Sequence, residues 1–264
     1  MVLIAKNIPV LTGRSKERFA PLLPAVALEV TLIILRLFVM FSPDVDQSID
    51  ELTTQDVFLL LSGGLPGYLL GSIPTAFLLV RWRTKADIRN SGSGNVGTLN
   101  SYQVTGSRII GLVVLVADIL KGFIAVWGAS LLSGGVYEVI AGAGVGAVLG
   151  HNFPVWLRFK GGRGLATAAG VFMFFSPAVV AAWGVFWFTG FLPLREVNIA
   201  NAIATLALLV LLWVLPDAII AGMTLVPGLA AGFRLFGSCI LAVVLIGHVR
   251  PIIAFAERRN SKSH

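Results

Sequence analysis

Long apolar runs separated by short polar loops dominate the pattern of this chain. Most runs reach the roughly 17–25 residues that an α-helix needs to cross the hydrocarbon core of a bilayer. None alternates between apolar and polar residues as a β-barrel strand does. The pattern therefore predicts an all-α bundle of transmembrane helices. The runs are 22–41, 57–80, 109–132, 137–156, 165–190, 199–215 and 235–253.

Prolines interrupt two of the apolar segments and change the expected number of helices. Ser176-Pro177 interrupts the run 165–190, and because proline starts a helix well but does not continue one, the run is expected to form a helical hairpin. That hairpin would return the polar patch 195–198 to the side on which the run began. The stretch 216–234 is too short, and too broken by Pro227, to count as a span.

Small residues mark one face of the run 137–156. Gly142, Gly146 and Gly150 recur every four residues, a spacing that lets two membrane helices bring their backbones close together. We interpret this stripe as a packing surface and not as a site of chemistry.

Composition agrees with a protein of the bilayer. The 264 residues are 56% apolar and only 12% charged, so the chain has more hydrophobic surface than a soluble fold of this length needs to bury. The single cysteine, Cys239, lies in an apolar run and cannot form an internal disulfide or a thiolate metal site. Although the net charge is +7, the cations lie in loops and tails, so they indicate topology and no nucleic-acid partner.

Charge asymmetry orients the chain. The loop 81–108 carries five cations against Asp87, whereas the segment 42–56 carries five acids and no cation. The positive-inside rule places the loop in the cytoplasm and the acidic segment outside. The basic residues 1–18 then also lie inside if 22–41 crosses the membrane. We expect two parts: an extension, 1–56, with an extra membrane helix and an acidic external loop, and a membrane domain, 57–264.

The extra helix carries two charges within its apolar run, Glu29 and Arg36. Each costs about 2.5–3.5 kcal/mol near the bilayer centre. Neighbouring helices must shelter them, or the helix lies at the interface.

A glycine-rich loop follows the run 57–80. Its glycines let backbone N–H groups approach an anion, and neutral polar side chains stand between them near one cation. The loop matches neither the P-loop order nor the strand-led dinucleotide motif. The loop therefore predicts a phosphate-binding site, and the alternative is a flexible loop at the membrane interface. Its candidate residues are Arg89, Gly92, Ser93, Gly94, Asn95, Gly97 and Asn100.

A second glycine loop precedes the helix expected from Leu165. It places two cations around a diglycine, and helix N-termini attract anions through their free N–H groups and dipole. We predict a second phosphate-binding site here, and the alternative is a positively charged membrane anchor. Its candidate residues are Lys160, Gly161, Gly162, Arg163 and, in the first helical turn, Thr167.

Four ionisable groups complete the candidate chemistry. Asp118 and Lys121 stand three residues apart on one helix face in mid-membrane, which fits either a functional pair or a mutually neutralising structural pair. His151 opens the second loop and could accept a proton or donate to a phosphate oxygen. His248 has the same two options, and for both histidines a satisfied core position is the alternative.

At these residues a resemblance becomes specific. GSIPTAFLLV from Gly71, SGSGNVGTLN from Ser91, the D-x-x-K-G step at Asp118 and GHNFPVWLRFKGGRGLAT from Gly150 resemble the bacterial acyl-phosphate:glycerol-3-phosphate acyltransferase family in order and spacing. The match covers roughly residues 58–215. It implies a membrane enzyme of about seven helices, to which this chain adds the N-terminal one.

The resemblance also implies an activity and a site. The enzyme would transfer a fatty acyl group from acyl phosphate to the 1-hydroxyl of glycerol 3-phosphate, as a monomer in the inner membrane with its site on the cytoplasmic side. No metal or organic cofactor is implied. One part of the site would comprise Ser72, Arg89, Ser93, Asn95 and Asn100. The glycerol-phosphate part would comprise His151, Lys160, Gly161, Gly162, Arg163 and Thr167.

The chain departs from the family pattern at several positions. Leu99 and Gln103 replace a threonine and an arginine, Arg163 replaces a lysine, and Asn198 and Asn201 replace two serines. The third motif is represented by His248 and Ile252, with Pro251 in place of asparagine. Two alternatives therefore stand beside the acyltransferase: a catalytically weak or altered homologue, and a small-solute permease.

Overall fold

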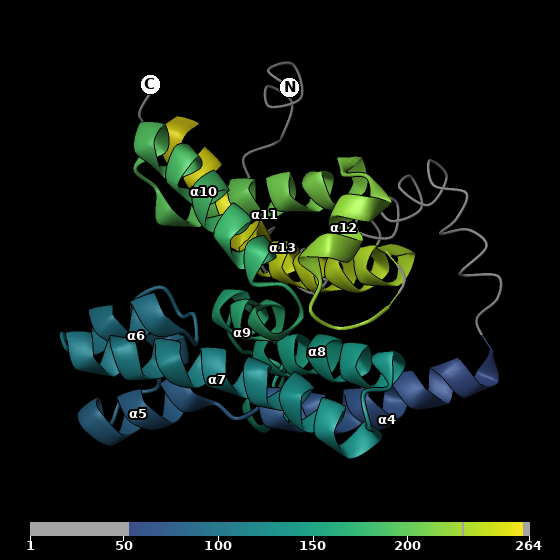
Figure 1. Cartoon of the computed structure of the whole chain (residues 1–264). Coiled ribbons are helices and arrows are strands. Elements are labelled where there is room, and N and C mark those ends of the chain that lie inside the picture. Colours follow the sequence, from purple (N-terminus) through teal and green to yellow (C-terminus); the bar gives the residue numbers. More distant parts are fainter. Residues whose placement is uncertain (1–52, 229, 261–264) are drawn as a thin grey trace.

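The structure, a computed structural model, describes residues 53–228 and 230–260, and every regular element within them is helical (Figure 1). The expected N-terminal helix at 22–41 and most of the acidic segment lie outside the described residues. The α-helices are α4 (Thr54–Gly71), α5 (Thr75–Thr84), α6 (Thr98–Thr105), α7 (Arg108–Ser133), α8 (Tyr137–Asn152), α9 (Leu165–Phe175), α10 (Pro177–Leu194), α11 (Val197–Val214), α12 (Asp217–Met223) and α13 (Ala230–Asn260). Short 3-10 turns, η2 (Ile88–Asn90) and η3 (Val155–Leu157), lie in the two glycine loops.

The predicted all-α membrane fold is confirmed. Within the described part of the chain, six helical stretches are long and apolar enough to cross a membrane, and α9 is apolar but shorter. The six stretches are Thr54–Thr84, Arg108–Ser133, Tyr137–Leu157, Pro177–Leu194, Val197–Val214 and Ala230–Arg259.

The predicted breaks are found, together with one that was not expected. α9 ends at Phe175 and α10 begins at Pro177, so Ser176-Pro177 does divide the run 165–190. The described residues of the stretch 216–234 form only the short helix α12 and the beginning of α13, so this stretch does not count as a span, as predicted. The run 57–80 is also divided, between α4 and α5 at residues 72–74, where Pro74 cannot donate the hydrogen bond that would continue the helix.

The glycine stripe is a packing surface. A Cβ atom on Gly142, Gly146 or Gly150 of α8 would overlap with the backbone of α4. α4 presents its own small residues in return, and a Cβ on Gly63, Gly67 or Gly71 would overlap with the backbone of α8. The two helices therefore pack backbone to backbone, which stabilises helix pairs in lipid, where no hydrophobic effect draws them together.

The helices form two layers (Figure 1). One contains α4 to α8 and the other contains α10 to α13. α9 lies between them, because it packs closely on α7 while also contacting α10 and α13. Aromatic side chains from α9 and α13 fill the interior here, and Phe175 lies with its ring centroid 4.3 Å from that of Phe236. The second layer is joined to the first mainly through α9 and the contact of α13 with α8.

Candidate functional site

The first glycine loop is held by one side chain, Asn100. Its Nδ2 donates to the carbonyl oxygens of Ile88, Ser91 and Asn95 at 3.2, 3.0 and 2.9 Å, and its Oδ1 accepts from the backbone N–H of Ser93 at 2.9 Å. Buried on α6, Asn100 uses all of its amide hydrogen bonds to shape the loop. The structure therefore favours a role for Asn100 in positioning the loop over direct contact with a substrate.

Two glycines of this loop need their conformational freedom. Gly92 and Gly94 have φ angles of 59° and 71°, in the left-handed region that side-chain-bearing residues rarely adopt. A Cβ on Gly92 would also overlap with Oδ1 of Asn100. Both glycines therefore serve the turn that Asn100 closes.

Arg89 joins the first loop to the second. Its Nε and Nη2 donate to the Asp87 carboxylate, at 3.0 Å to Oδ1 and 2.6 Å to Oδ2, while Nη1 donates to the carbonyl oxygen of Leu157 at 3.2 Å. The guanidinium also lies 5.4 Å from the centre of the Phe77 ring. These hydrogen bonds hold the pKa of Asp87 below its ordinary value and raise that of Arg89, so both groups stay charged.

The second loop folds back on the end of α8. Gly161 and Gly162 donate their backbone N–H groups to the carbonyl oxygens of Asn152 and His151, at 3.1 and 3.0 Å. The carbonyl of Gly161 in turn accepts from the backbone N–H of Val96 in the first loop, at 3.5 Å. The two glycine loops therefore lie at the same end of the bundle.

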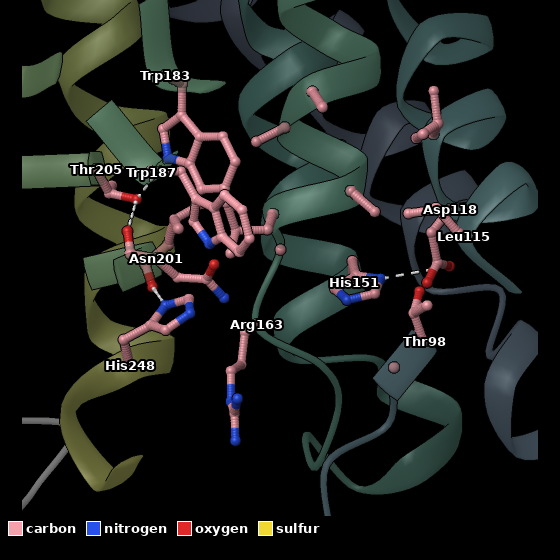
Figure 2. A pocket seen from close by; sticks show the side chains of 18 of the residues that line it. Thr98, Leu115, Asp118, His151, Arg163, Trp183, Trp187, Asn201, Thr205 and His248 are labelled. Atoms are coloured by element: carbon pink, nitrogen blue, oxygen red, sulfur yellow. Dashed lines mark hydrogen bonds and ion pairs between the residues drawn. The ribbon is translucent and has the colours of Figure 1, made fainter. Parts of the chain in front are cut away.

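A cavity of about 510 Å³ lies between the two helical layers at this end (Figure 2). Its polar lining comes from both loops and from five helices: Asn95, Thr98, Asp118, His151, Arg163, Asn198, Asn201, Thr205 and His248. Its apolar lining includes Leu115, Phe172, Val179, Val180, Trp183, Trp187, Leu208, Leu241 and Val244. Phe172, Thr205 and Leu241 lie two helical turns, or about 10 Å, deeper than Leu165, Asn198 and His248 on the same helices.

Three polar groups from distant segments converge at one end of this cavity. Nη1 of Arg163 donates to Oδ1 of Asn198 at the start of α11. His248 is buried on α13, with Nδ1 2.8 Å from the carbonyl of Val244, and its Nε2 has no hydrogen-bond partner among the described residues. Burial lowers the pKa of Arg163, but a guanidinium remains charged at any physiological pH. The meeting of Arg163 with Asn198 also confirms that the patch 195–198 returns to the side of the loops.

Asp118 and Lys121 form a buried ion pair of 2.9 Å on α7. Asp118 lines the cavity and also approaches His151, with Oδ1 3.6 Å from Nδ1 (Figure 2). Lys121 points away from the large cavity and donates to the carbonyl oxygen of Ile73 at 3.2 Å. The pair therefore contacts the site through its acid and not through its base.

The remaining predicted site residues lie outside the cavity lining. Ser93 and Lys160 are exposed on the two loops. Thr167 is buried where α9 packs on α7, and Gly122 approaches its backbone. Ser72 is buried at the end of α4, beside a second cavity of about 10 Å³ that Asp118, Lys121 and His151 also line.

Several lining residues carried no signal that singled them out in the sequence. Trp183 and Trp187 look like ordinary membrane-helix residues, yet both point into the cavity, and Nε1 of Trp183 donates to Oγ1 of Thr205 at 3.1 Å (Figure 2). The spacing of Asn198, Asn201 and Thr205 along α11, at three and seven residues, marks one polar helix face and could have indicated their common orientation.

Known proteins resemble the chain over most of this architecture. Residues 62–257 match the family model described as glycerol-3-phosphate acyltransferase. A glycerol-3-phosphate acyltransferase from Agrobacterium fabrum (strain C58 / ATCC 33970) is 41% identical over 157 residues, which span 60% of this chain and 75% of that protein. One from Geotalea daltonii is 43% identical over 157 residues, spanning 59% and 76%.

Solved structures give the same relationship. The crystal structure of PlsY (YgiH), an integral membrane glycerol 3-phosphate acyltransferase, in its glycerol 3-phosphate form, is 32% identical with a TM-score of 0.62, covering 78% of this chain and 94% of that one. Its lysophosphatidic acid form has a TM-score of 0.60 at the same identity. Taken with the paired glycine loops and the membrane-embedded cavity, these matches show that the chain belongs to the membrane-integral glycerol-3-phosphate acyltransferase family.

Proposed function

We propose that this chain transfers a fatty acyl group from acyl phosphate to the 1-hydroxyl of sn-glycerol 3-phosphate. The products are 1-acyl-glycerol 3-phosphate, which is lysophosphatidic acid, and inorganic phosphate, so the reaction is the first step of phospholipid biosynthesis. The observation that carries this proposal is a single cavity whose polar end holds Arg163, Asn198 and His248 and whose body is apolar. One reactant is a small anion and the other has a long apolar chain, and the cavity offers a region for each.

The polar end suits a phosphate group. Arg163 supplies a fixed charge with several donors, and Asn198 is already within its hydrogen-bonding reach. Because the carbonyl of Val244 can only accept, the proton of neutral His248 is on Nδ1, and the unpartnered Nε2 can accept from a hydroxyl group of the ligand. We assign the phosphate of glycerol 3-phosphate to this cluster. The exposed Lys160, three residues away from Arg163 on the same loop, adds charge at the entrance.

The apolar body suits the acyl chain. Phe172, Val179 and Leu208 line its deeper part, and Trp187 lies beside Trp183 along α10. Burying methylene groups there is favourable by about 0.8 kcal/mol each relative to water. The chain would lie among the helices while its phosphate-activated carbonyl remains near the loops.

The chemistry needs positioning more than covalent catalysis. An acyl phosphate is already activated, so the glycerol hydroxyl can attack its carbonyl carbon and expel phosphate without an acyl-enzyme intermediate. Asn95 lines the cavity and Ser93 lies on the rim of the same loop, where they can donate to the developing oxyanion or the leaving phosphate. The hydroxyl proton passes to His151 or to a phosphate oxygen of the substrate.

The setting follows from charge. The first glycine loop is flanked in the sequence by the cations Arg81, Arg83, Lys85 and Arg108, and the second loop lies at the same end of the bundle. The positive-inside rule assigns that end to the cytoplasm. We therefore propose that the active site faces the cytoplasm at the inner membrane. A monomer is what the family resemblance implies.

A direct assay tests this function. The protein, purified in detergent, is given palmitoyl phosphate and glycerol 3-phosphate, and release of inorganic phosphate is followed together with the lipid product by mass spectrometry. Palmitoyl-coenzyme A replaces palmitoyl phosphate in a parallel reaction. Turnover with acyl phosphate alone supports the proposal. Turnover only with the thioester contradicts the donor, and no turnover with either donor favours the altered-homologue alternative.

A further inference from the structure

One long face of α4 is exposed in the described part of the chain. The helix packs on α8 and α7, and its buried residues are the three glycines that face α8. A stripe on the other side, at positions 58, 62, 65 and 69, is exposed. Its apolar members, Phe58, Leu65 and Leu69, are 70%, 65% and 53% accessible. Lipid alone would suit this face if it were apolar throughout.

Ser62 places a polar group in the middle of that stripe. A carbonyl in a helix accepts from the N–H four residues later, but residue 66 is a proline inside α4 and has no N–H to donate. The Ser62 hydroxyl is engaged elsewhere, because it donates to the carbonyl oxygen of Leu59 at 2.7 Å. Ser62 lies eight residues after Thr54, the first residue of α4, which is about 12 Å along the helix. Lipid tails offer no donor there, so the Ser62 carbonyl calls for a donor from protein.

The run 22–41 brings charges that also need protein partners. The sequence predicts that this run crosses the membrane; it lies outside the described residues and is joined to α4 through residues 42–53. Its charges, Glu29 and Arg36, are seven residues apart, so they fall on one face of a helix, because seven residues make almost two turns. Charges in a membrane helix face the protein and pair with other charges or with backbone carbonyls. The charged face of the run is therefore expected to meet the helical bundle.

An antiparallel pairing of the two runs brings Arg36 level with Ser62. Arg36 is five residues from the end of the run 22–41, and Ser62 is five residues from the start of the run 57–80. The twelve connecting residues can span at most about 40 Å, and packed helices need only about 8–10 Å. In this register four positions on each helix share the spacing four, three, four: 40, 36, 33 and 29 against 58, 62, 65 and 69.

Other exposed faces fit Arg36 less well. The helix α7 contains no proline, so its carbonyls keep their helical donors. The prolines in α10 and α13, Pro193 and Pro251, free the carbonyls of Thr189 and Gly247. Both of these lie toward the end of the bundle with the glycine loops, whereas Arg36 is near the opposite end of its run.

We propose that the run 22–41 packs antiparallel on the exposed face of α4, with Arg36 donating to the carbonyl oxygen of Ser62. Arginine has five donors and no acceptor, which is what a carbonyl without a donor requires. The contact satisfies two groups that lipid cannot, and it makes the N-terminal extension a structural part of the membrane domain. The proposal does not depend on the acyl-transfer chemistry.

Disulfide cross-linking of the full-length protein in membranes tests the contact. In a Cys239→Ser background, Ile33→Cys is combined with Leu65→Cys, oxidised with copper phenanthroline, and the linked peptides are identified by mass spectrometry. We expect an internal disulfide. The control, Leu35→Cys with Leu65→Cys, has its first cysteine on the opposite face of the run and should give little. Three results would overturn the proposal: no internal link, a link only between two Leu65→Cys chains, or a more efficient link from Ile33→Cys to Val185→Cys on α10.

A double-mutant cycle tests the hydrogen bond separately. Pro66→Ala returns an N–H to the Ser62 carbonyl, so Arg36 is no longer needed there. We expect Arg36→Leu to lower the Tm in detergent by about 2–4 °C more in the wild type than in the Pro66→Ala background. Pro193→Ala is the matched control and should leave the effect of Arg36→Leu unchanged. An equal effect of Arg36→Leu with and without Pro66→Ala would overturn the proposed hydrogen bond.

Discussion

At the scale of single residues, the space beside His151 is the tightest constraint in the site. A Cβ on Gly162 would overlap with Nε2 of His151 and approach the carbonyl oxygen of Val96. We predict that Gly162→Ala lowers kcat at least tenfold, because the imidazole must turn away from the cavity. Helix content by circular dichroism should stay unchanged. Gly184→Ala is the matched control, since a Cβ there meets nothing within 4 Å among the described residues, and wild-type kinetics in Gly162→Ala would contradict the packing argument.

The Asp87–Arg89 pair makes the order of the first loop dependent on pH. The pKa of Asp87 is lowered from its ordinary value of 3.8 by its hydrogen bond to Arg89. A lowered pKa in the folded state means that the pair stabilises the loop above that value, and that this stabilisation disappears as the pH falls through the folded pKa. We therefore expect a nitroxide at position 93 to become mobile as the pH falls below about 4.

Electron paramagnetic resonance of Ser93→Cys, labelled in a Cys239→Ser background, measures this mobility. In Asp87→Asn the label should already be mobile at neutral pH and show little further change on acidification. A label that is equally immobile in both proteins at pH 7 would show that the pair does not order the loop.

The sequence identified the polar residues of both loops but not what each of them binds. Asn100 and Arg89 were predicted to contact substrate, yet their donors are engaged by Ile88, Asp87 and Leu157. Ile88 and Asp87 are brought into reach by the folding of the first loop on itself, and Leu157 is brought into reach by the approach of the second loop, which is far away in the chain. Residue type gives hydrogen-bonding capacity, whereas the choice of partner depends on tertiary structure.

At the scale of helices, hydropathy and proline position predicted most of what is observed. Apolar length identified the spans, and Ser176-Pro177 identified the division between α9 and α10. The division at Pro74 was not predicted, because the apolar run 57–80 is long enough to cross the membrane as one continuous helix. The stripe on α8 was predicted as a packing face, but its partner α4 is not adjacent in sequence, so contact between the two could not be inferred from local pattern.

The contact between α4 and α8 can be tested with single methyl groups. A Cβ on Gly67 would overlap with the backbone of Ala143, whereas one on Gly64 would lie in ordinary contact, 3.6 Å from the carbonyl oxygen of Gly142. We predict that Gly67→Ala destabilises the protein by about 1–3 kcal/mol, as overpacking does. Thermal unfolding in detergent measures this. Gly64→Ala, the control, should unfold near the wild-type temperature, and equal stability of the two variants would contradict backbone-to-backbone packing.

At the scale of the whole molecule, the cavity arises where two helical layers meet. α10 and α11 pack against one another but reach the first layer mainly through α9 and α13, which leaves room, at the end of the bundle with the two glycine loops, for a cavity with one polar and one apolar part. No single segment encodes such a space, because its lining comes from helices separated by more than a hundred residues. That is why the sequence predicted the polar rim and not the depth or the tryptophan lining.

Trp183 lines the apolar part of this cavity. We therefore expect its size to affect which acyl-chain lengths the cavity accepts. Its indole is fixed between α10 and α11, because Nε1 donates to Oγ1 of Thr205, which itself donates to the carbonyl of Asn201 at 2.7 Å. We predict that Trp183→Ala opens space and shifts kcat/KM toward stearoyl over lauroyl phosphate, while Trp183→Phe shifts it less. Competition assays measure the ratio, with the exposed Trp82→Ala as control. An identical ratio in all four proteins would show that the chain lies elsewhere.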